Sequence, residues 1–173
     1  MGTGRVRVTD AAADGTVDLM PGETHSFVLT LEATDPGPVT LTAQVEALDG
    51  ATGSSLQAEL APLDLTLESP VLLAIEETVV PMAVDVGQQF DVTVTVANEG
   101  EAAARLVAVE LEAAQVGGIA FDRIAGPAPV AAHLMATERQ AFTFTLEAKS
   151  AGNLLLKAHA VGIDDNDQSA VTS

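Results

Sequence analysis

The chain of 173 residues contains no cysteine, no tryptophan and no tyrosine. Without cysteine there can be no disulfide framework, no thiol nucleophile and no thiolate metal site. Without tryptophan and tyrosine the exposed aromatic platforms that bind carbohydrate are missing. These absences remove several common enzyme and lectin designs.

Positive charge is scarce, since 7 basic residues stand against 25 acidic ones and the net charge is −18. The surface should therefore be negative and repel nucleic acid and anionic membranes. Such an excess occurs in proteins adapted to high salt and also in ordinary secreted repeat proteins, and both alternatives stay open. No apolar run approaches the ~20 residues that cross a bilayer, so no membrane insertion is expected within this segment. Residues 1–20 also lack the pattern of a signal peptide, so an export signal would have to lie outside this chain.

Apolar residues make up 47% of the chain, and they alternate with polar ones most clearly in QQFDVTVTVANEG at residues 88–100. Alternation with period two predicts a β-strand with one wet face, and Asn98-Glu99-Gly100 predicts the turn that ends it. Phe90, Val92, Val94 and Val96 form the apolar face. We expect this face to meet Phe142, Phe144 and Leu146 in the core.

The same pattern recurs along the chain and predicts an all-β fold. Residues 99–112 could also be drawn as an amphipathic helix, but β-branched Val107 and Val109 and the lack of a 3.6-residue apolar stripe favour a strand. Pro70 interrupts the alternation and is the expected boundary between domains 1–69 and 70–173. The expected strands are 5–8, 17–20, 25–33, 38–47, 55–60, 63–67, 71–79, 88–97, 105–112, 119–124, 130–135, 141–148 and 154–162.

An internal repeat appears at an offset of 115 residues, the distance from Phe27 to Phe142. The run TLEA at residues 30–33 recurs unchanged at 145–148, and Asp49 falls on Asp164 without a gap. This pattern indicates a tandem duplication. Each copy is expected to form a hairpin, 25–33 with 39–47 and 141–148 with 154–162.

The two copies differ in completeness. The second copy has upstream strands between 71 and 112, whereas their equivalents in the first would precede Met1, and the second copy is expected to stop within its last strand. We therefore expect a segment of a longer repeat protein. Phe27, Leu29 and Leu31 would then need cover, either from the strand 63–67 or from an upstream half.

Residues 86–109 carry a family resemblance. The order is Gly87, an alternating strand, Asn98-x-Gly100, a few mostly small residues and Val107-x-Val109. It resembles the Ig-like, cell-adhesion-related surface repeats of bacteria and archaea, over roughly 70–173 and over the later half of a copy in 1–69. The resemblance implies an Ig-like β-sandwich in tandem, with the first copy incomplete, and no catalytic residues. The missing Trp and Cys argue against an antibody-type domain.

The densest group of possible ligands is Asp164-Asp165-Asn166-Asp167. Carboxylate and amide oxygens are ligands that calcium prefers, but the order does not match an EF-hand. A solvated loop tip at the end of a hairpin is the simpler interpretation, and calcium shared with a neighbouring domain is the alternative.

The remaining candidate site residues do not match a catalytic or metal-binding motif. His25, His133 and His159 lack metal-ligand spacing, and His159 is expected to face solvent. Neither Ser54-Ser55 nor Ser169 has the context of a nucleophile elbow. Glu76 and Glu77 should point to opposite faces of a strand, and Gly117-Gly118 lacks the spacing of a phosphate-binding loop.

The sequence predicts a protein that is not an enzyme and needs no cofactor or metal. We expect a structural spacer or adhesion module of a larger exported or cell-surface repeat protein. Its expected partners are neighbouring repeats of the same protein, and other surface proteins or polysaccharide. The alternatives are an accessory binding module of a secreted hydrolase, contacting polysaccharide or calcium, and a subunit of a surface fibre or layer.

Overall fold

The computed structural model describes residues 3–11, 16–116 and 120–173, which form fourteen strands and no helix. The prediction of an all-β fold is therefore confirmed. No described segment forms a helix long and apolar enough to cross a membrane. The chain divides into two compact units, Met1–Glu68 (unit 1) and Ser69–Ser173 (unit 2). The division falls just before Pro70.

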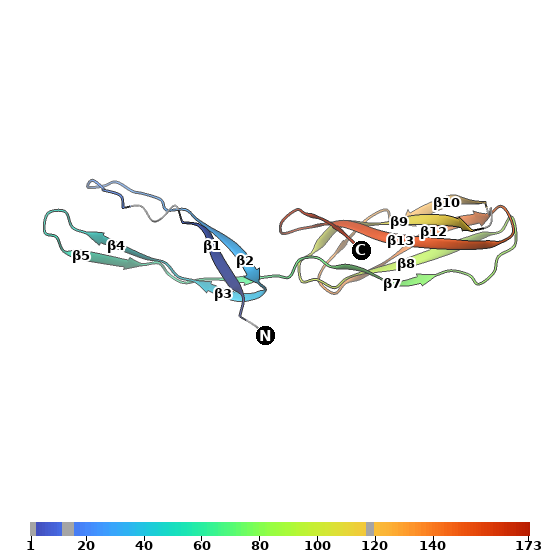
Figure 1. The fold of residues 1–173 in the computed structure, drawn as a ribbon, viewed down its shortest axis with the longest axis horizontal. Helices are drawn as coiled ribbons and strands as arrows, with labels where there is room; N and C mark the ends of the chain where they lie inside the picture. Colours follow the sequence, from blue (N-terminus) through green and yellow to red (C-terminus); the bar gives the residue numbers. More distant parts are fainter. Residues whose placement is uncertain (1–2, 12–15, 117–119) are drawn as a thin grey trace. The chain divides into compact units, whose positions relative to one another are not determined.

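Unit 2 contains two four-stranded antiparallel sheets (Figure 1). Their strand orders are β10-β12-β8-β7 and β11-β9-β13-β14, so consecutive strands often lie in different sheets. The strands are β7 (Leu73–Val79), β8 (Gln89–Asn98), β9 (Ala104–Val116), β10 (Phe121–Ala128), β11 (Ala132–Leu134), β12 (Arg139–Ala148), β13 (Asn153–Asp164) and β14 (Ala170–Thr172).

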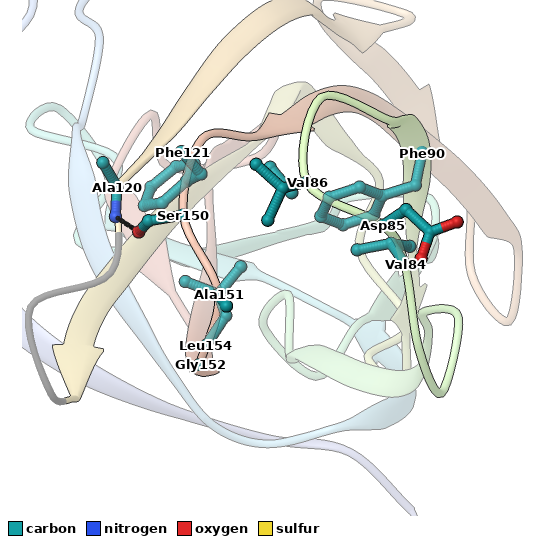
Figure 2. A pocket seen from close by; sticks show the side chains of 11 residues that line it. Val84, Asp85, Val86, Phe90, Ala120, Phe121, Ser150, Ala151, Gly152 and Leu154 are labelled. Carbon is teal, nitrogen blue, oxygen red and sulfur yellow. Dashed lines mark hydrogen bonds between the residues drawn. The ribbon is translucent and has the colours of Figure 1, made fainter.

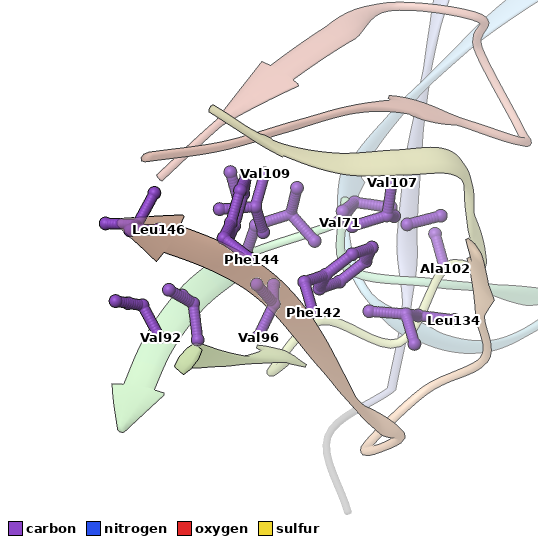
Figure 3. Close-up of a cluster of buried hydrophobic side chains, with 14 residues drawn as sticks. Val71, Val92, Val96, Ala102, Val107, Val109, Leu134, Phe142, Phe144 and Leu146 are labelled. Carbon is purple, nitrogen blue, oxygen red and sulfur yellow. The ribbon is translucent and has the colours of Figure 1, made fainter. Parts of the chain in front are cut away.

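The core of unit 2 lies between these sheets (Figure 3). In the register of β8 with β12, Val94 faces Phe142 and Val92 faces Phe144. These four side chains are fully buried, as are Val96 and Leu146, while Phe90 is partly buried. The predicted meeting of the two apolar faces is confirmed, and each such side chain contributes about 1.5–3 kcal/mol by burial. The opposing sheet adds Val107, Val109 and Ala160.

Residues 104–116 form strand β9, so the expectation of a strand and not a helix over residues 105–112 is confirmed. The strand carries a bulge at Leu106. Val161 pairs with Ala108 and Ile163 with Arg105, so two residues, Leu106 and Val107, lie opposite Gly162. Leu106 has a positive φ of 52° and is 60% exposed. The extra residue of a bulge leaves the ladder, which turns Leu106 out of the core while Val107 stays in it.

Unit 1 has three two-stranded ribbons, β1-β2, β3-β6 and β4-β5. No described residue of unit 1 is fully buried. Phe27, Leu29 and Leu31 are 45%, 48% and 37% exposed, and β6 pairs with β3 and not with β2. The strands are β1 (Arg5–Ala11), β2 (Leu29–Asp35), β3 (Gly37–Leu41), β4 (Gln44–Leu48), β5 (Ser55–Glu59) and β6 (Leu63–Leu67).

Several predicted details are wrong. Residues 17–20 form no strand, and 38–47 is divided between β3 and β4. Neither expected hairpin exists, because β2 pairs with β1, whereas β12 and β13 belong to different sheets. The chain between β12 and β13 therefore crosses from one sheet to the other. Ile119, the start of one expected strand, and Gly117-Gly118 lie outside the described residues.

The two units nevertheless share their strand register at the offset of 115 residues. In unit 1 Val6, Arg7, Val8 and Asp10 pair with Ala33, Glu32, Leu31 and Thr30. In unit 2 Phe121, Asp122, Arg123 and Ala125 pair with Ala148, Glu147, Leu146 and Thr145. Each pair of residues in the first set becomes a pair in the second when 115 is added, and the bulge falls at the same place. Strands β1 and β2 are therefore the counterparts of β10 and β12.

The turns repeat as well. Glu23 N–H donates to Met20 O at 3.0 Å, and Glu138 N–H donates to Met135 O at 3.2 Å. In both turns the glutamate carboxylate accepts from the methionine N–H, at 2.9 Å and 2.8 Å. The positive φ that each turn needs is supplied by Gly22 in one and by Thr137 in the other.

The last hairpin repeats in the same way. Glu46, Ala47 and Leu48 pair with Gln57, Leu56 and Ser55, and Val161, Gly162 and Ile163 pair with Thr172, Val171 and Ala170. Strands β4 and β5 are therefore the counterparts of the end of β13 and of β14.

Candidate functional site

Asn98, at the end of β8, is a fully buried polar residue. Its Nδ2 donates to Ala102 O at 2.8 Å and to Leu134 O at 3.3 Å, while its Oδ1 accepts from Gly100 N–H at 3.1 Å. The Oδ1 also accepts from Leu72 N–H at 3.4 Å. Asn98 thus satisfies backbone groups of three segments that end at one corner, as buried polar groups require.

Gly100 completes this corner. A Cβ at residue 100 would lie 2.2 Å from Pro70 O and 2.9 Å from Leu72 N. Only glycine allows the chain at residues 70–72 to approach so closely. The Asn98-x-Gly100 motif is therefore a structural lock between β7, β8 and β11.

Asp164, the first residue of the predicted calcium loop, is 2% exposed. Its Oδ2 accepts from Val71 N–H and its Oδ1 from Asn166 N–H, at 2.9 Å and 2.8 Å. The interpretation of the whole loop as a solvated tip is wrong at this residue. Its carboxylate is buried where Val71, just before β7, donates to it at the end of β13.

Asp165 joins the ends of two further strands. Its Oδ1 lies 3.2 Å from Arg105 Nε of β9, and its Oδ2 lies 3.0 Å from His133 Nε2 of β11. Gln168 accepts from Arg105 and donates to Asp165 O. These side chains are about one third to one half exposed, so the pairs contribute little stability individually.

Asp167 closes the loop on itself. Its Oδ1 accepts from Ser169 N–H at 2.8 Å, and the hydrogen bonds of Ser169 hold the pKa of Asp167 below its ordinary value. The three carboxylates of the loop therefore have separate protein partners and share none. Among the described residues no group of three or more potential ligands is arranged to hold a metal ion.

Unit 1 contains the same turn in simpler form. Asp49 Oδ1 accepts from Ala51 N–H and Thr52 N–H, both at 2.8 Å, and these bonds lower the pKa of Asp49. Asp49 O accepts from Gly53 N–H, as Asp164 O accepts from Gln168 N–H. The shared feature of the two loops is thus a turn that closes the hairpin.

The other candidate residues remain apart. His159 is 37% exposed and its Nε2 lies 3.0 Å from Glu110, while the ring of His25 packs edge-on against Phe27. Glu76 lies at a bulge of β7 and pairs with Arg139, which lowers the pKa of Glu76. Glu76 and His159 are thus each paired with one oppositely charged or titratable side chain, and His25 contacts an aromatic ring.

A pocket of about 280 Å³ lies at the end of unit 2 where the chain enters β8 (Figure 2). Ser150 Oγ already accepts from Ala120 N–H, and Asp85 supplies the lining's single carboxylate. The lining is otherwise mainly apolar and includes Val84, Val86, Phe90, Phe121 and Leu154. A binding pocket usually needs several convergent polar groups to orient a ligand, and this lining offers few.

No protein-family model matches this chain, and the search of curated proteins found no match either.

Sequence reasoning missed the buried roles of Asn98 and Asp164. A signal was present for each, because Asn98 precedes a turn glycine and Asp164 falls on Asp49 in the internal repeat. Their burial depends on Val71 and Leu72, which are distant in sequence, and no local pattern reports that contact.

Proposed function

We propose that this protein is a non-catalytic structural module, an Ig-like repeat that acts as a spacer or adhesion unit of a larger exported or cell-surface protein. The observation that carries the proposal is the recurrence of register and turns at the offset of 115 residues. Repeated sandwiches of one type extend a chain without adding chemistry.

The strand order of unit 2 supports the Ig-like part of the proposal. If β7, β8, β9, β10, β12, β13 and β14 are read as A to G, the sheets are A-B-E-D and C-F-G, with β11 added beside C. This is the arrangement of constant-type Ig domains. The fold by itself does not imply a function, so the spacer role rests on the repeat.

Charge and site chemistry also support the proposal. The net charge of −18 keeps neighbouring modules soluble and separate. The carboxylates, imidazoles and buried amide described above are used to hold strand ends together. These contacts therefore support a structural role for the groups.

Surface labelling of intact source cells tests this function. Antibodies raised against unit 2 should label intact cells, and brief protease treatment of those cells should remove the labelling. Labelling only after lysis would contradict the exported location. Permeabilised cells and an antibody against a cytosolic protein serve as controls.

A further inference from the structure

In unit 2 strand β12 has a partner on each edge. It pairs with β10 along one edge and with β8 along the other, where Leu146 faces Phe90 and Phe144 faces Val92. Its counterpart in unit 1, β2, pairs with β1 alone among the described residues. One edge of β2 therefore presents backbone N–H and C=O groups with no strand beside them.

The ribbons β3-β6 and β4-β5 of unit 1 also have an edge without a strand beside it among the described residues. The register of β4-β5 continues into β3-β6 with a shift of one residue, and Leu60 N–H donates to Ala43 O between them. Strands β5 and β6 thus run along one edge of β3 and β4, as β14 does beside β13. In unit 2 the opposite edge of β13 pairs with β9. No described strand pairs with that edge of β3 and β4, although Gly4 N–H, ahead of β1, donates to Pro38 O of β3 at 3.1 Å.

The apolar faces show the same difference. Phe142, Phe144 and Leu146 are 0% exposed, whereas their counterparts Phe27, Leu29 and Leu31 are 45%, 48% and 37% exposed. Val45 is 43% exposed where Ala160 is fully buried. The side chains are apolar at every one of these matched positions, so an apolar covering strand of the same type suits both faces.

We propose that the open edges of unit 1 accept a three-strand segment of the repeat's own type, equivalent to residues 69–116, joined directly ahead of Gly2. The segment pairs its β8-type strand with β2 and its β9-type strand with β3 and β4. This inference goes beyond the spacer role and does not depend on it.

The sequence offset fixes the chemistry of the occupant and its point of attachment. The β8-type strand must alternate large apolar residues, as Phe90, Val92 and Val94 do, and the Asn-x-Gly lock must follow it. In the sequence, residues 117–119 follow β9, and at the offset of 115 they fall on residues 2–4, directly before β1. A covalently joined segment therefore enters unit 1 through the connection that unit 2 already uses. Strands added to an open sheet edge gain main-chain hydrogen bonds as well as apolar burial.

The test extends the full chain by duplicating residues 69–116 directly ahead of Gly2. Hydrogen exchange followed by NMR should show the amides of residues 29–33 and 44–48 protected at least about 100-fold more than in the unextended chain. A second cooperative unfolding transition should appear. The amides of β8 and β12 in unit 2 serve as an internal reference for correct folding.

A matched control carries Val92→Asp and Val94→Asp in the duplicated segment only, and it should lose the added protection. Leu31→Asp in the extended chain should lose it too. An extended chain in which unit 2 stays protected and residues 29–33 exchange as before would overturn the proposal. The unextended chain mixed with a separate peptide of residues 84–101 should show no such protection. Equal protection by that peptide would overturn the covalent attachment.

Discussion

Phe144 in unit 2 and Leu29 in unit 1 occupy the same position of the repeat, yet their exposed fractions are 0% and 48%. Both lie in strands that pair with the same register to the strand before them in the sheet. The comparison separates two contributions to the fold. Register and turns are shared by the two units, whereas the burial seen in unit 2 also involves residues of β7, β8 and β9.

The pairing of β9 in unit 2 also explains local differences between the units. Residues 132–134 form β11 because β9 pairs with them, whereas the matching residues 17–19 have no such partner and form no strand. Strand β13 is continuous beside β9, whereas its counterpart is divided into β3 and β4. In these two cases the strand continues where a neighbouring strand pairs with it and stops where none does.

The largest expected effect comes from substituting the matched apolar pair. Phe144→Ala should lower the free energy of unfolding of unit 2 by about 3–5 kcal/mol, because it opens a cavity in a closed core. Leu29→Ala should change stability by less than about 0.5 kcal/mol, since its side chain is not enclosed. Urea unfolding followed by far-ultraviolet circular dichroism measures both, since the chain lacks tryptophan and tyrosine. Equal losses at the two positions would contradict the comparison.

Removing the side chain of Asn98 sharpens the difference, because no described residue of unit 1 is buried. Asn98→Ala should destabilise unit 2 by about 1–3 kcal/mol, since it leaves the N–H groups of Leu72 and Gly100 without their acceptor. Gln89→Ala, at an exposed position of the same strand, is the control and should cost less than about 0.5 kcal/mol. Thermal unfolding by calorimetry distinguishes the two variants. Indistinguishable melting temperatures would argue against the lock.

The repeated turn gives an effect of similar size, with a matched pair of aspartates. Asp164→Ala should cost unit 2 about 1–3 kcal/mol, because the buried Val71 N–H loses its acceptor. Asp49→Ala removes the same turn bonds at an exposed site and should leave the stability of unit 2 unchanged. NMR spectra of each variant, recorded at increasing urea, report on the two units separately. Destabilisation of unit 2 by the Asp49 variant would contradict the expectation that Asp49 contributes to the turn of unit 1 alone.

The smallest effect concerns pH. The N–H and hydroxyl of Ser69 donate to Glu101, and they lower its pKa below the ordinary value of 4.5. The folded state therefore releases this proton more readily than the unfolded state, so the contribution is present above pH 4.5 and lost as pH falls through the folded pKa. Glu101→Gln should flatten this acid-side slope of unit 2 stability. A slope identical to that of the parent chain would show that Glu101 makes no such contribution.

Much of the fold followed from alternation alone. The faces of β8 and β12, the rejection of a helix at residues 99–112 and the repeat were all readable because they depend on sequence order and period. The pairing partners were not readable, since a strand such as β12 carries the same pattern whether it pairs with β13 or with β8. The absence of a calcium cluster among the described residues likewise depends on where Asp164 and Asp165 point, which follows from contacts with Val71, Arg105 and His133.

Amide hydrogen exchange of the full chain, read residue by residue, tests the central claim that the two units share a backbone register and differ in their covering strands. The account predicts strong protection on both edges of β12 and along β13, with weak protection in β2 and β4 at positions 115 residues earlier. It also predicts cross-strand nuclear Overhauser contacts between Val8 and Leu31 that match those between Arg123 and Leu146. Equal protection in β2 and β12, or a different register in β1-β2, would contradict it.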